Sequence, residues 1–572
     1  AMIRAQDWDM ILRDEIQRRY IAFEEKEFRE RSIISLPYKR RKIALKSSLY
    51  QGQQVNLLLN KYLSPAYDIS DFSKLQTPFL CIGTDLLTGE AITLKSGYLP
   101  FAVRASMSIP GYFSPTEYQG RFLVDGGVVD NYPAKQLQEA GAQLIIGANV
   151  QSGLTDSINK LETITEVLDQ VISFSRVPAN LKAEKIIDLN IQYHVKEGMM
   201  DFTAYDSIIA YGERVAREHY DELKELADSL NAIEEVPVKK FEAKPLEKVF
   251  INEVSYTGKD KMSTIFLDNF FEDFEGREVR LDQIEETVTR LYGTRFFQHV
   301  FYKLEPVGDN MANLIIELKE GAPGYFSASL HYDNDYEGSI MLSGVFRNLL
   351  GNRSKLFSSL VLGPNPRFRL LYMISNGPNI GPGIELDFYS FRFDDFDGDK
   401  KTNTIRFINY KTSAFISSVI DNLYRFRAGV DLEFFSLKPE IEDDLLKNMT
   451  DFNGYLSGYV SFRTDTRDRP YFSTSGFDSD LNVSYILPLG NNWSQELFTN
   501  SLMYYLRYDQ NLPMSKKFTA KTGVYLGGTL KQDLPPIHHW FGIGGLVPIN
   551  YMGNFAPFTG VSFVQSFGLY TA

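Results

Sequence analysis

The sequence has one cysteine, Cys81, among its 572 residues. An intramolecular disulfide and a cysteine-based zinc or iron–sulfur site are therefore excluded, and we expect Cys81, in an apolar stretch, to be a small buried residue. Long apolar runs are also absent, since none approaches the ~18 residues that a membrane-spanning helix needs. Any membrane insertion must therefore use strands. The first residues lack the basic and apolar segments of a secretory signal, and if the protein is exported we expect that signal upstream of residue 1 or removed.

Positive charge is in short supply. The chain has 60 Lys and Arg against 73 Asp and Glu, a formal net charge of −13, and these charges form no long blocks of one sign. Proteins that hold nucleic acids rely on basic patches that contact phosphates, so we expect no nucleic-acid partner.

Tryptophan is scarce, at 3 residues, whereas 33 Tyr and 42 Phe are present. That excess fits both soluble cores and the aromatic girdles of outer-membrane barrels.

Residues 1–233 alternate helical patterns with short apolar runs closed by glycine. This alternation predicts an α/β domain with parallel strands. Apolar residues at helical spacing between 158 and 172 predict a helix whose apolar face packs in the core. Residues 234–245 contain Pro237 and Pro245 and predict a linker between domains.

Residues 246–320 follow the order β-α-α-β-β. Strands are expected at 249–254, 296–304 and 313–318, and helices near 262–272 and 281–291. The segment resembles a POTRA domain, the periplasmic module that precedes the barrel in outer-membrane assembly and transport proteins. Its matching features are Tyr256-Thr257-Gly258 after the first strand, Leu291-Tyr292-Gly293 at the end of the second helix, and Phe296-Phe297 at the start of the next strand.

From residue 321 to residue 572 the pattern changes to long alternating strands. In the stretch Tyr424 to Phe434, one side carries Tyr424, Phe426, Ala428, Val430, Leu432 and Phe434, and the other carries Arg425, Arg427, Gly429, Asp431 and Glu433. Such alternation predicts an apolar face toward lipid and a charged face toward a wet interior. About twelve strand candidates of membrane-spanning length predict an antiparallel transmembrane β-barrel. A large soluble β-sandwich is the alternative, although soluble strands are usually shorter.

Two motifs in this region resemble those of one outer-membrane transporter superfamily, which contains barrel-assembly and two-partner-secretion proteins. Residues 465–476, beginning Asp465-Thr466-Arg467-Asp468-Arg469-Pro470, are similar to its D-x-R-D-x-P … G turn. Residues 541–546 resemble the start of its lumen-entering loop, whereas Met552-Gly553-Asn554-Phe555 lacks the arginine of the V-R-G-F/Y motif that follows. In the superfamily this loop joins the eleventh and twelfth of sixteen strands. The resemblance therefore implies that the barrel continues beyond Ala572, because an open edge has no partners in lipid.

Asp125 is the strongest candidate for a catalytic residue. A strand ending in Leu123-Val124 predicts that Asp125 lies at the carboxyl edge of a parallel sheet, where open α/β folds place their ligands. Gly126 and Gly127 then allow a sharp turn and leave space for substrate. The first histidine in the chain is His194. A Ser-His-Asp triad within the motif region is therefore excluded.

Residues 101–113 and 123–133, together with 83–90 upstream, resemble the patatin-like phospholipases over about residues 5–230. The resemblance implies that Asp125 accepts the proton of a serine nucleophile directly, in a dyad without histidine. It also implies that Ile109, Pro110, Gly111 and Tyr112 wall the substrate pocket. The expected substrate is a phospholipid or another acyl ester, and no metal or organic cofactor is implied.

The serine partner of Asp125 is missing from the motifs that match. No G-x-S-x-G occurs in the sequence, whereas patatin-like enzymes carry this nucleophile elbow and a glycine-rich oxyanion loop N-terminal to the matching part. Two interpretations stay open: the chain begins after the elbow, which we favour, or the domain is catalytically inactive.

Other polar residues have structural interpretations. Ser106 and Ser108 fall in a segment that walls the pocket in the family. Asp85 is expected to form a turn, and Asp130 to have a structural role. The adjacent pair His538-His539 is too small a set for a metal site.

These patterns predict an outer-membrane lipolytic acyl hydrolase, a phospholipase A or esterase, anchored or translocated by its own POTRA domain and barrel as in patatin-like autotransporters of type V secretion. The alternatives are a translocator with the hydrolase domain as its cargo, and a scaffold with a degenerate patatin domain. Expected partners are the acyl-ester substrate and outer-membrane lipid. The sequence leaves open a homodimer, and whether the hydrolase domain is periplasmic or at the cell surface.

Overall fold

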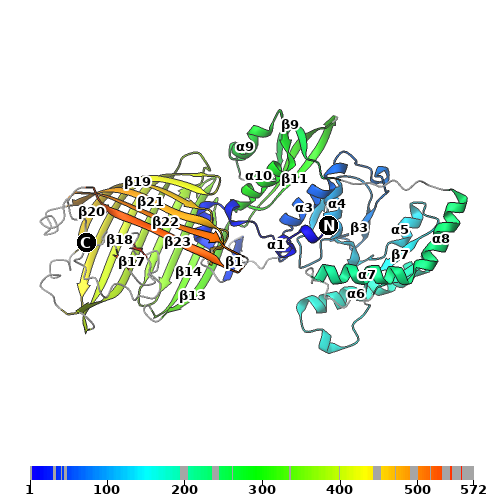
Figure 1. The fold of residues 1–572 in the computed structure, drawn as a ribbon, viewed down its shortest axis with the longest axis horizontal. Coiled ribbons are helices and arrows are strands. Elements are labelled where there is room, and N and C mark those ends of the chain that lie inside the picture. The colour runs from blue at the N-terminus through cyan, green and yellow to red at the C-terminus, as the bar shows by residue number, and fades with distance from the viewer. Residues whose placement is uncertain are drawn as a thin grey trace.

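The computed structural model describes residues 3–29, 34–39, 42–43, 48–151, 153–193, 204–234, 244–259, 262–308, 310–333, 337–397, 400–441, 452–470, 472–489, 500–515, 517–530, 542–543 and 555–556. Figure 1 shows a barrel-shaped sheet at one end, an α/β domain at the other, and between them a small module, residues 246–320, named here the middle module. Among the described residues, no helix is long and apolar enough to cross a membrane.

The barrel-shaped part is one antiparallel sheet, which has 13 strands within the described residues, in the order β2-β1-β13 and then consecutively to β23. Its strands are β1 (Ile34–Lys39), β2 (Lys42–Ile43), β13 (Gly324–Asp333), β14 (Glu337–Arg347), β15 (Ser354–Leu362), β16 (Arg367–Ile374), β17 (Gly381–Asp397), β18 (Lys400–Ile420), β19 (Tyr424–Pro439), β20 (Asn453–Asp465), β21 (Gly476–Leu489), β22 (Ser501–Pro513) and β23 (Thr519–Thr529). The long strands predicted after residue 321 are thus present. The predicted lumen-entering loop and His538-His539 lie almost entirely outside the described residues.

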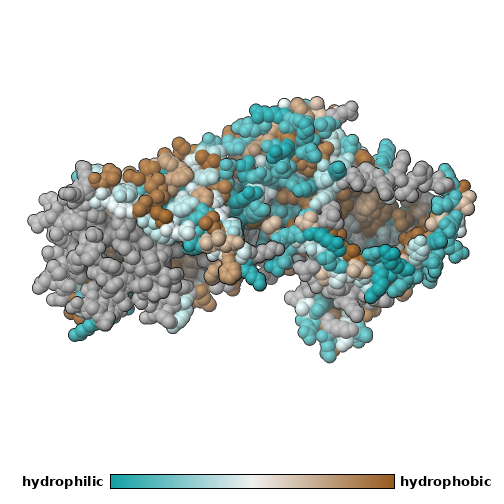
Figure 2. Space-filling model, in the orientation of Figure 1, coloured by the Kyte–Doolittle hydropathy of each residue, from teal (hydrophilic) through white to brown (hydrophobic). Residues whose placement is uncertain are grey.

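The two faces of this sheet differ as the sequence predicted. Along β19, Phe426 and Val430 are exposed, whereas Arg425, Asp431 and Glu433 are buried. Figure 2 shows hydrophobic side chains along the upper part of the barrel's outer face. An apolar exterior and a charged interior are the arrangement of a transmembrane β-barrel, because the exterior faces lipid.

The middle module has a four-stranded sheet in the order β10-β9-β12-β11. Its elements are β9 (Lys248–Thr257), α9 (Thr264–Phe271), β10 (Arg277–Arg280), α10 (Leu281–Gly293), β11 (Phe297–Gly308) and β12 (Met311–Glu320). The predicted strands and helices are present, and β10 is an addition. The sequence pattern missed β10 because this strand has four residues, of which only Val279 is apolar and buried.

The α/β domain has a four-stranded sheet in the order β4-β3-β6-β5 and a separate pair, β7 and β8. Its strands are β3 (Cys81–Asp85), β4 (Ala91–Leu94), β5 (Thr116–Tyr118), β6 (Arg121–Asp125), β7 (Ile146–Asn149) and β8 (Leu189–Gln192). Its helices are α1 (Trp8–Leu12), α3 (Gln53–Leu63), α4 (Leu99–Ser106), α5 (Ala134–Glu139), α6 (Ile164–Ala183), α7 (Tyr205–Glu218) and α8 (Tyr220–Ile233).

The expectation of parallel strands around Asp125 is wrong. Strand β6 runs antiparallel to both of its neighbours, β3 and β5. Only Gln119 and Gly120 separate β5 from β6, and both have positive φ. Parallel neighbours need a crossover of a dozen or more residues, whereas a two-residue connection can only make a hairpin. Within the described part of this domain, strands β7 and β8 pair in parallel, and an isolated parallel bridge joins Tyr50 and Phe113.

The prediction for residues 158–172 is correct in its helix from Ile164, where α6 begins, and wrong in its packing. Val167, Leu168 and Val171 lie on α6 but are exposed. Helical spacing specifies that apolar residues share a face, and it does not specify what covers that face.

The chain leaves the α/β domain after α1 and returns to it at α3. Between them, helix α2 (Phe23–Arg29) packs against the barrel, and β1 pairs with β13 in antiparallel register. Helix α2 and strand β1, predicted as part of the 1–233 domain, therefore belong spatially to the barrel. The predicted linker, 234–245, lies mostly outside the described residues.

The α/β domain also packs directly on the middle module. The buried side chain of Gln53 donates a hydrogen bond to the carbonyl of Val300 at 2.7 Å and accepts one from its N–H at 2.8 Å. The rings of Phe101 and Phe301 lie 6.1 Å apart. The two hydrogen bonds of Gln53 satisfy the backbone groups of Val300 on the outer edge of β11, which would otherwise be unpaired.

Replacing Gln53 with alanine should weaken this junction. The change leaves the N–H and carbonyl of Val300 buried without partners, which destabilises the fold by roughly 1–3 kcal/mol. Thermal unfolding of the protein in detergent should show the loss. Gln54→Ala is the matched control, since the Gln54 side chain makes no hydrogen bond within the described residues. Equal melting temperatures for the two variants would contradict the role given to Gln53.

Candidate active site

Asp125 is the last residue of β6 and caps the short 3-10 helix Gly126–Val128. Its Oδ1 accepts a hydrogen bond from the N–H of Gly127 at 2.7 Å. Its backbone N–H donates to the carbonyl of Ser108 at 2.9 Å, and the hydroxyl of Thr84 donates to its carbonyl at 2.9 Å. The Gly127 N–H thus orients the carboxylate, while Ser108 and Thr84 fix the backbone of Asp125.

Neither Gly126 nor Gly127 has a positive φ, so the backbone conformation does not require glycine at these positions. Glycine is required instead because neighbouring atoms lie too close for a Cβ. A Cβ on Gly126 would lie 2.3 Å from the carbonyl oxygen of Ile82, a backbone atom of the β3 region. A Cβ on Gly127 would lie 2.6 Å from Oδ1 of Asn131. The Asp-Gly-Gly sequence therefore lets the turn after Asp125 press against the neighbouring strand.

Burial raises the pKa of Asp125 above its ordinary value. The N–H of Gly127 and the positive charge of Arg176 act in the opposite direction. Arg176 itself is paired with Asp169, its nearest nitrogen lying 3.0 Å from the carboxylate. A carboxylate with a raised pKa accepts a proton more readily, as a general base requires.

The predicted pocket wall, Ile109 to Tyr112, follows Ser108 and so begins beside Asp125. Gly111 has a φ of +80°, which favours glycine. The N–H groups of Leu49 and Tyr50 donate to the carbonyls of Gly111 and Tyr112, each at 2.9 Å. The structure thus brings the start of this segment to Asp125, while its role as a pocket wall stays a prediction.

Ser108 has a structural role. It is completely buried, and its hydroxyl accepts a hydrogen bond from Nη1 of Arg104 at 2.6 Å and donates one to the Arg104 carbonyl at 2.8 Å. Asp85 forms the predicted turn, since it accepts a hydrogen bond from the N–H of Leu87 and pairs with Arg121 at 2.8 Å. Asp130 accepts a hydrogen bond from the side chain of Gln136 at 2.6 Å.

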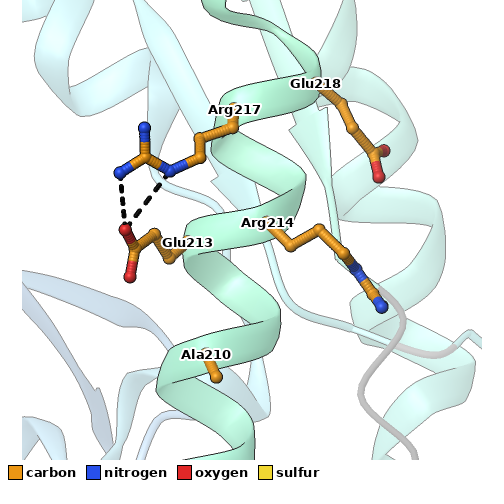
Figure 3. Close-up of a pocket in the computed structure, with 5 residues that line it drawn as sticks. All are labelled: Ala210, Glu213, Arg214, Arg217 and Glu218. Atoms are coloured by element: carbon orange, nitrogen blue, oxygen red, sulfur yellow. Dashed lines mark hydrogen bonds and ion pairs between the residues drawn. The ribbon is translucent and has the colours of Figure 1, made fainter.

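Two cavities add little to this site. One, of about 400 Å³, lies along α7 and is lined by Ala210, Glu213, Arg214, Arg217 and Glu218, with Glu213 and Arg217 forming an exposed ion pair (Figure 3). The other, of about 1190 Å³, lies at the mouth of the barrel and is lined by residues of all three parts of the molecule. Neither is lined by Asp125. Among the residues described, no group of three or more His, Cys, Asp or Glu side chains could hold a metal ion.

Two family models match the chain, one in its N-terminal part and one in its C-terminal part. A model of patatin-like phospholipases matches residues 11–137, which include Asp125 and its two glycines. A model of the OMP85 superfamily matches residues 312–568. The chain is a patatin-like phospholipase domain joined to an OMP85-superfamily barrel. Its barrel places the protein in the bacterial outer membrane.

Curated relatives match the patatin-like domain over short stretches. An uncharacterized NTE family protein of Mycobacterium tuberculosis is 38% identical over 77 residues, which are 14% of this chain and 21% of that protein. A patatin-like phospholipase domain-containing protein of Caenorhabditis elegans is 33% identical over 146 residues, 24% of this chain and 10% of that protein. A lysophospholipase of Meyerozyma guilliermondii is 29% identical over 93 residues, 16% of this chain and 6% of that protein. The chain thus spans about a fifth or less of the length of these relatives.

Solved structures share a limited likeness with the chain. BamA from Haemophilus ducreyi, lacking POTRA domains 1–3, is 15% identical with a TM-score of 0.39, over 52% of this chain and 59% of that one. CdiB from Acinetobacter baumannii is 14% identical with a TM-score of 0.33, over 73% of this chain and 78% of that one.

Replacing Gly126 with alanine should destabilise the patatin-like domain. The added methyl group meets the backbone oxygen of Ile82, which cannot swing away as a side chain can, so we expect a loss of roughly 1–3 kcal/mol. Gly212→Ala is the control, because a Cβ there would make an ordinary contact of 3.6 Å with Tyr193. That variant should be neutral or slightly stabilised, as alanine favours helices over glycine. Denaturant unfolding of both variants measures the difference, and a Gly126→Ala protein as stable as its parent would refute the close approach.

Proposed function

We propose that the protein is a lipolytic acyl hydrolase of the outer membrane, a phospholipase A or esterase that uses a Ser-Asp dyad with Asp125 as the proton acceptor. The environment of the Asp125 carboxylate carries the proposal. The carboxylate lies within the patatin-like match, and the N–H of Gly127 fixes its Oδ1. Burial also raises its pKa. Its Oδ2 accepts no hydrogen bond within the described residues and is therefore available for a proton.

In the proposed reaction, a serine hydroxyl attacks the acyl carbonyl while Asp125 takes its proton, and the same carboxyl returns that proton to the departing alcohol, leaving the acyl group on the serine. Water then attacks this acyl-serine ester while Asp125 takes a proton from the water and returns it to the serine oxygen, so that the fatty acid leaves. The Gly127 N–H keeps the carboxylate aimed during both steps. Ser108 is unsuited to be the nucleophile, because its hydroxyl is buried and bonded to Arg104. We assign the nucleophilic serine to no residue of this chain.

We propose phospholipid as the substrate class, since one relative is named a lysophospholipase and the family model is that of phospholipases. We also propose that the middle module is a POTRA domain, supported by its two helices against a mixed sheet, and that the domains divide at the linker 234–245. A homodimer is a further proposal that rests on the resemblance alone.

A scaffold or translocator with an inactive patatin-like domain is the second candidate. It is favoured by the absence of a G-x-S-x-G sequence from the chain. Activity of the full-length protein on acyl esters separates the two functions.

Asp125→Asn should greatly slow hydrolysis without weakening the fold. Asparagine can still accept the Gly127 hydrogen bond but cannot take the proton, so we expect a rate lower by a factor of order 10² to 10⁴. Because burial raises the folded-state pKa of Asp125, the ionised form opposes folding above that pKa. The variant should therefore be at least as stable as its parent at neutral pH. Parental activity should fall as the pH drops through the raised pKa of Asp125, because the protonated carboxyl can no longer accept a proton.

The measurement is release of fatty acid from phospholipid vesicles and from a short-chain ester, together with thermal unfolding. Asp130→Asn is the matched control, since Asp130 lies five residues along the chain and bonds to Gln136. It should hydrolyse at near the parental rate. A fully active Asp125→Asn protein would overturn the dyad, and an inert parent would favour the scaffold.

A further inference from the structure

The patatin-like domain and the middle module interlock where α3 and α4 meet α10, β11 and β12, and we name this contact the joint. Leu57 of α3 belongs to the hydrophobic core cluster of the middle module, together with Ile284 and Val288 of α10. Phe301 of β11 belongs in turn to a core cluster of the patatin-like domain. Each domain thus completes part of the core of the other. In Figure 1, α3 lies beside β11 and α10.

Glu285 of α10 places a carboxyl group inside the joint without a direct partner. Its Oε1 is buried and accepts no hydrogen bond within the described residues. The charges that act on it are Lys61 of α3, across the joint, and Asp282 of its own helix, and in the described part of the chain it forms no ion pair. A buried carboxylate without a partner destabilises the structure around it.

Tyr302 of β11 is the titratable residue that acts on Glu285 from the sheet. Its side chain is almost completely buried, and its hydroxyl makes no hydrogen bond within the described residues. Burial, and after it the charge of Glu285, raise the pKa of this hydroxyl well above its ordinary value. The sheet therefore offers Glu285 a neutral dipole rather than a cation.

A second carboxyl group, that of Glu317 in β12, lies on the other face of the same sheet. Glu317 is directly opposite Phe301 in the antiparallel register of β11 and β12, and residues paired in this way share a face. That face is covered by the patatin-like domain, since the Phe301 ring lies 6.1 Å from the ring of Phe101 in α4. Lys303 attracts the charge of Glu317, whereas Glu117 of β5, a carboxylate of the patatin-like domain, repels it.

Both carboxyl groups bind a proton more readily in the joint than in water. Burial raises the pKa of Glu285 to about 7, although Lys61 acts in the opposite direction. Burial likewise raises the pKa of Glu317. In an open joint, an exposed glutamate has an ordinary pKa of about 4.3. Protonation of Glu285 therefore favours the closed joint, and this contribution is lost progressively as the pH rises from the ordinary value to about 7.

His299 of β11 responds to pH with the opposite sign. Its ring stacks on that of Phe301 with centroids 4.2 Å apart, and burial lowers its pKa to about 3, with Lys319 and Arg104 acting in the same direction. An exposed histidine takes up a proton below about pH 6.5, so acid opposes closing of the joint through this residue. Above that pH His299 is neutral in both forms, and the two carboxyl groups act without it.

We propose that the joint is a proton-dependent lock, which holds the patatin-like domain on the middle module while Glu285 and Glu317 are neutral and loosens when they are ionised. Two features of the geometry carry the proposal. Glu285 has a buried oxygen without a hydrogen-bond donor, and Glu317 lies on the face of the sheet that the patatin-like domain covers. The proposal is independent of the proposed hydrolysis, because neither residue belongs to the site around Asp125.

Hydrogen exchange of the Val300 amide measures opening of the joint in the full chain in detergent, because Gln53 holds this N–H from across the joint. Glu285→Gln keeps the size of the side chain and removes its ionisation. The variant should exchange more slowly than its parent at about pH 8. The ratio of the parental rate to the variant rate should be larger at about pH 8 than at about pH 5.5 by a factor on the order of ten, since one unit of pKa corresponds to tenfold in affinity.

Comparing the two proteins at one pH cancels the pH dependence of intrinsic exchange and the contribution of His299, which both proteins share. Glu286→Gln is the matched control, because Glu286 is the next residue of α10 and is exposed. It makes the same change in charge outside the joint and should exchange at the parental rate at both pH values. Glu317→Gln is a second variant, and its ratio should grow with pH in the same direction as that of Glu285→Gln.

A rate ratio for Glu285→Gln that is the same at both pH values would overturn the lock, since it would mean that the substitution alters packing and not proton binding. Equal exchange in the parent and in both Gln variants of the joint would overturn it as well. Faster exchange of Glu285→Gln than of its parent at the higher pH would contradict the sign of the effect. If Glu285→Gln does not fold, as judged by circular dichroism, Glu317→Gln is measured against the same three outcomes.

Discussion

Charges that line the inside of a barrel must be neutralised by one another or by something placed among them. Here the acidic helix α2 supplies part of that neutralisation, with Glu25 against Arg347 and Lys355, and Glu27 against Arg463. The positions of the patatin-like domain and the middle module depend on this neutralisation of charge. Helix α2 lies between α1 and α3, which pack together in the patatin-like domain. Holding α2 in the barrel therefore also fixes where that domain can lie. The middle module then packs between them through Gln53 and Val300.

The site around Asp125 follows a different constraint, which is close packing of backbone on backbone. Gly126 approaches the carbonyl of Ile82 within a distance that any side chain would prevent. That contact, with the hydrogen bonds from Gly127 and to Ser108, holds the carboxylate in a partly buried place. Burial raises its pKa, so the packing that positions Asp125 also adjusts its proton affinity.

Much of the fold could be predicted from local pattern. The period-two alternation of Tyr424 to Phe434 gave the correct inward and outward faces of β19, because side chains of a strand alternate whatever its neighbours are. The strands and helices of the middle module were found by the same logic, except β10, which is too short to carry a pattern. Asp125 and its glycines were identified by motif. The direction of the strands beside β6 was not, since pairing depends on connections rather than on the strand itself.

The sequence by itself determined the spacing of apolar residues along each helix and strand and the families that the two domains resemble. It also determined the candidate base, Asp125. Only the tertiary structure decided the place of Arg18, helix α2 and strand β1. An acidic run such as Glu24-Glu25-Lys26-Glu27 is typical of a solvated helix face, and its partners are remote: Glu25 and Arg347 are 322 residues apart, and Arg18 and Asp465 are 447 apart. No local periodicity encodes such pairs. They form because folding brings unlike buried charges together, and a buried charge without a partner is strongly destabilising.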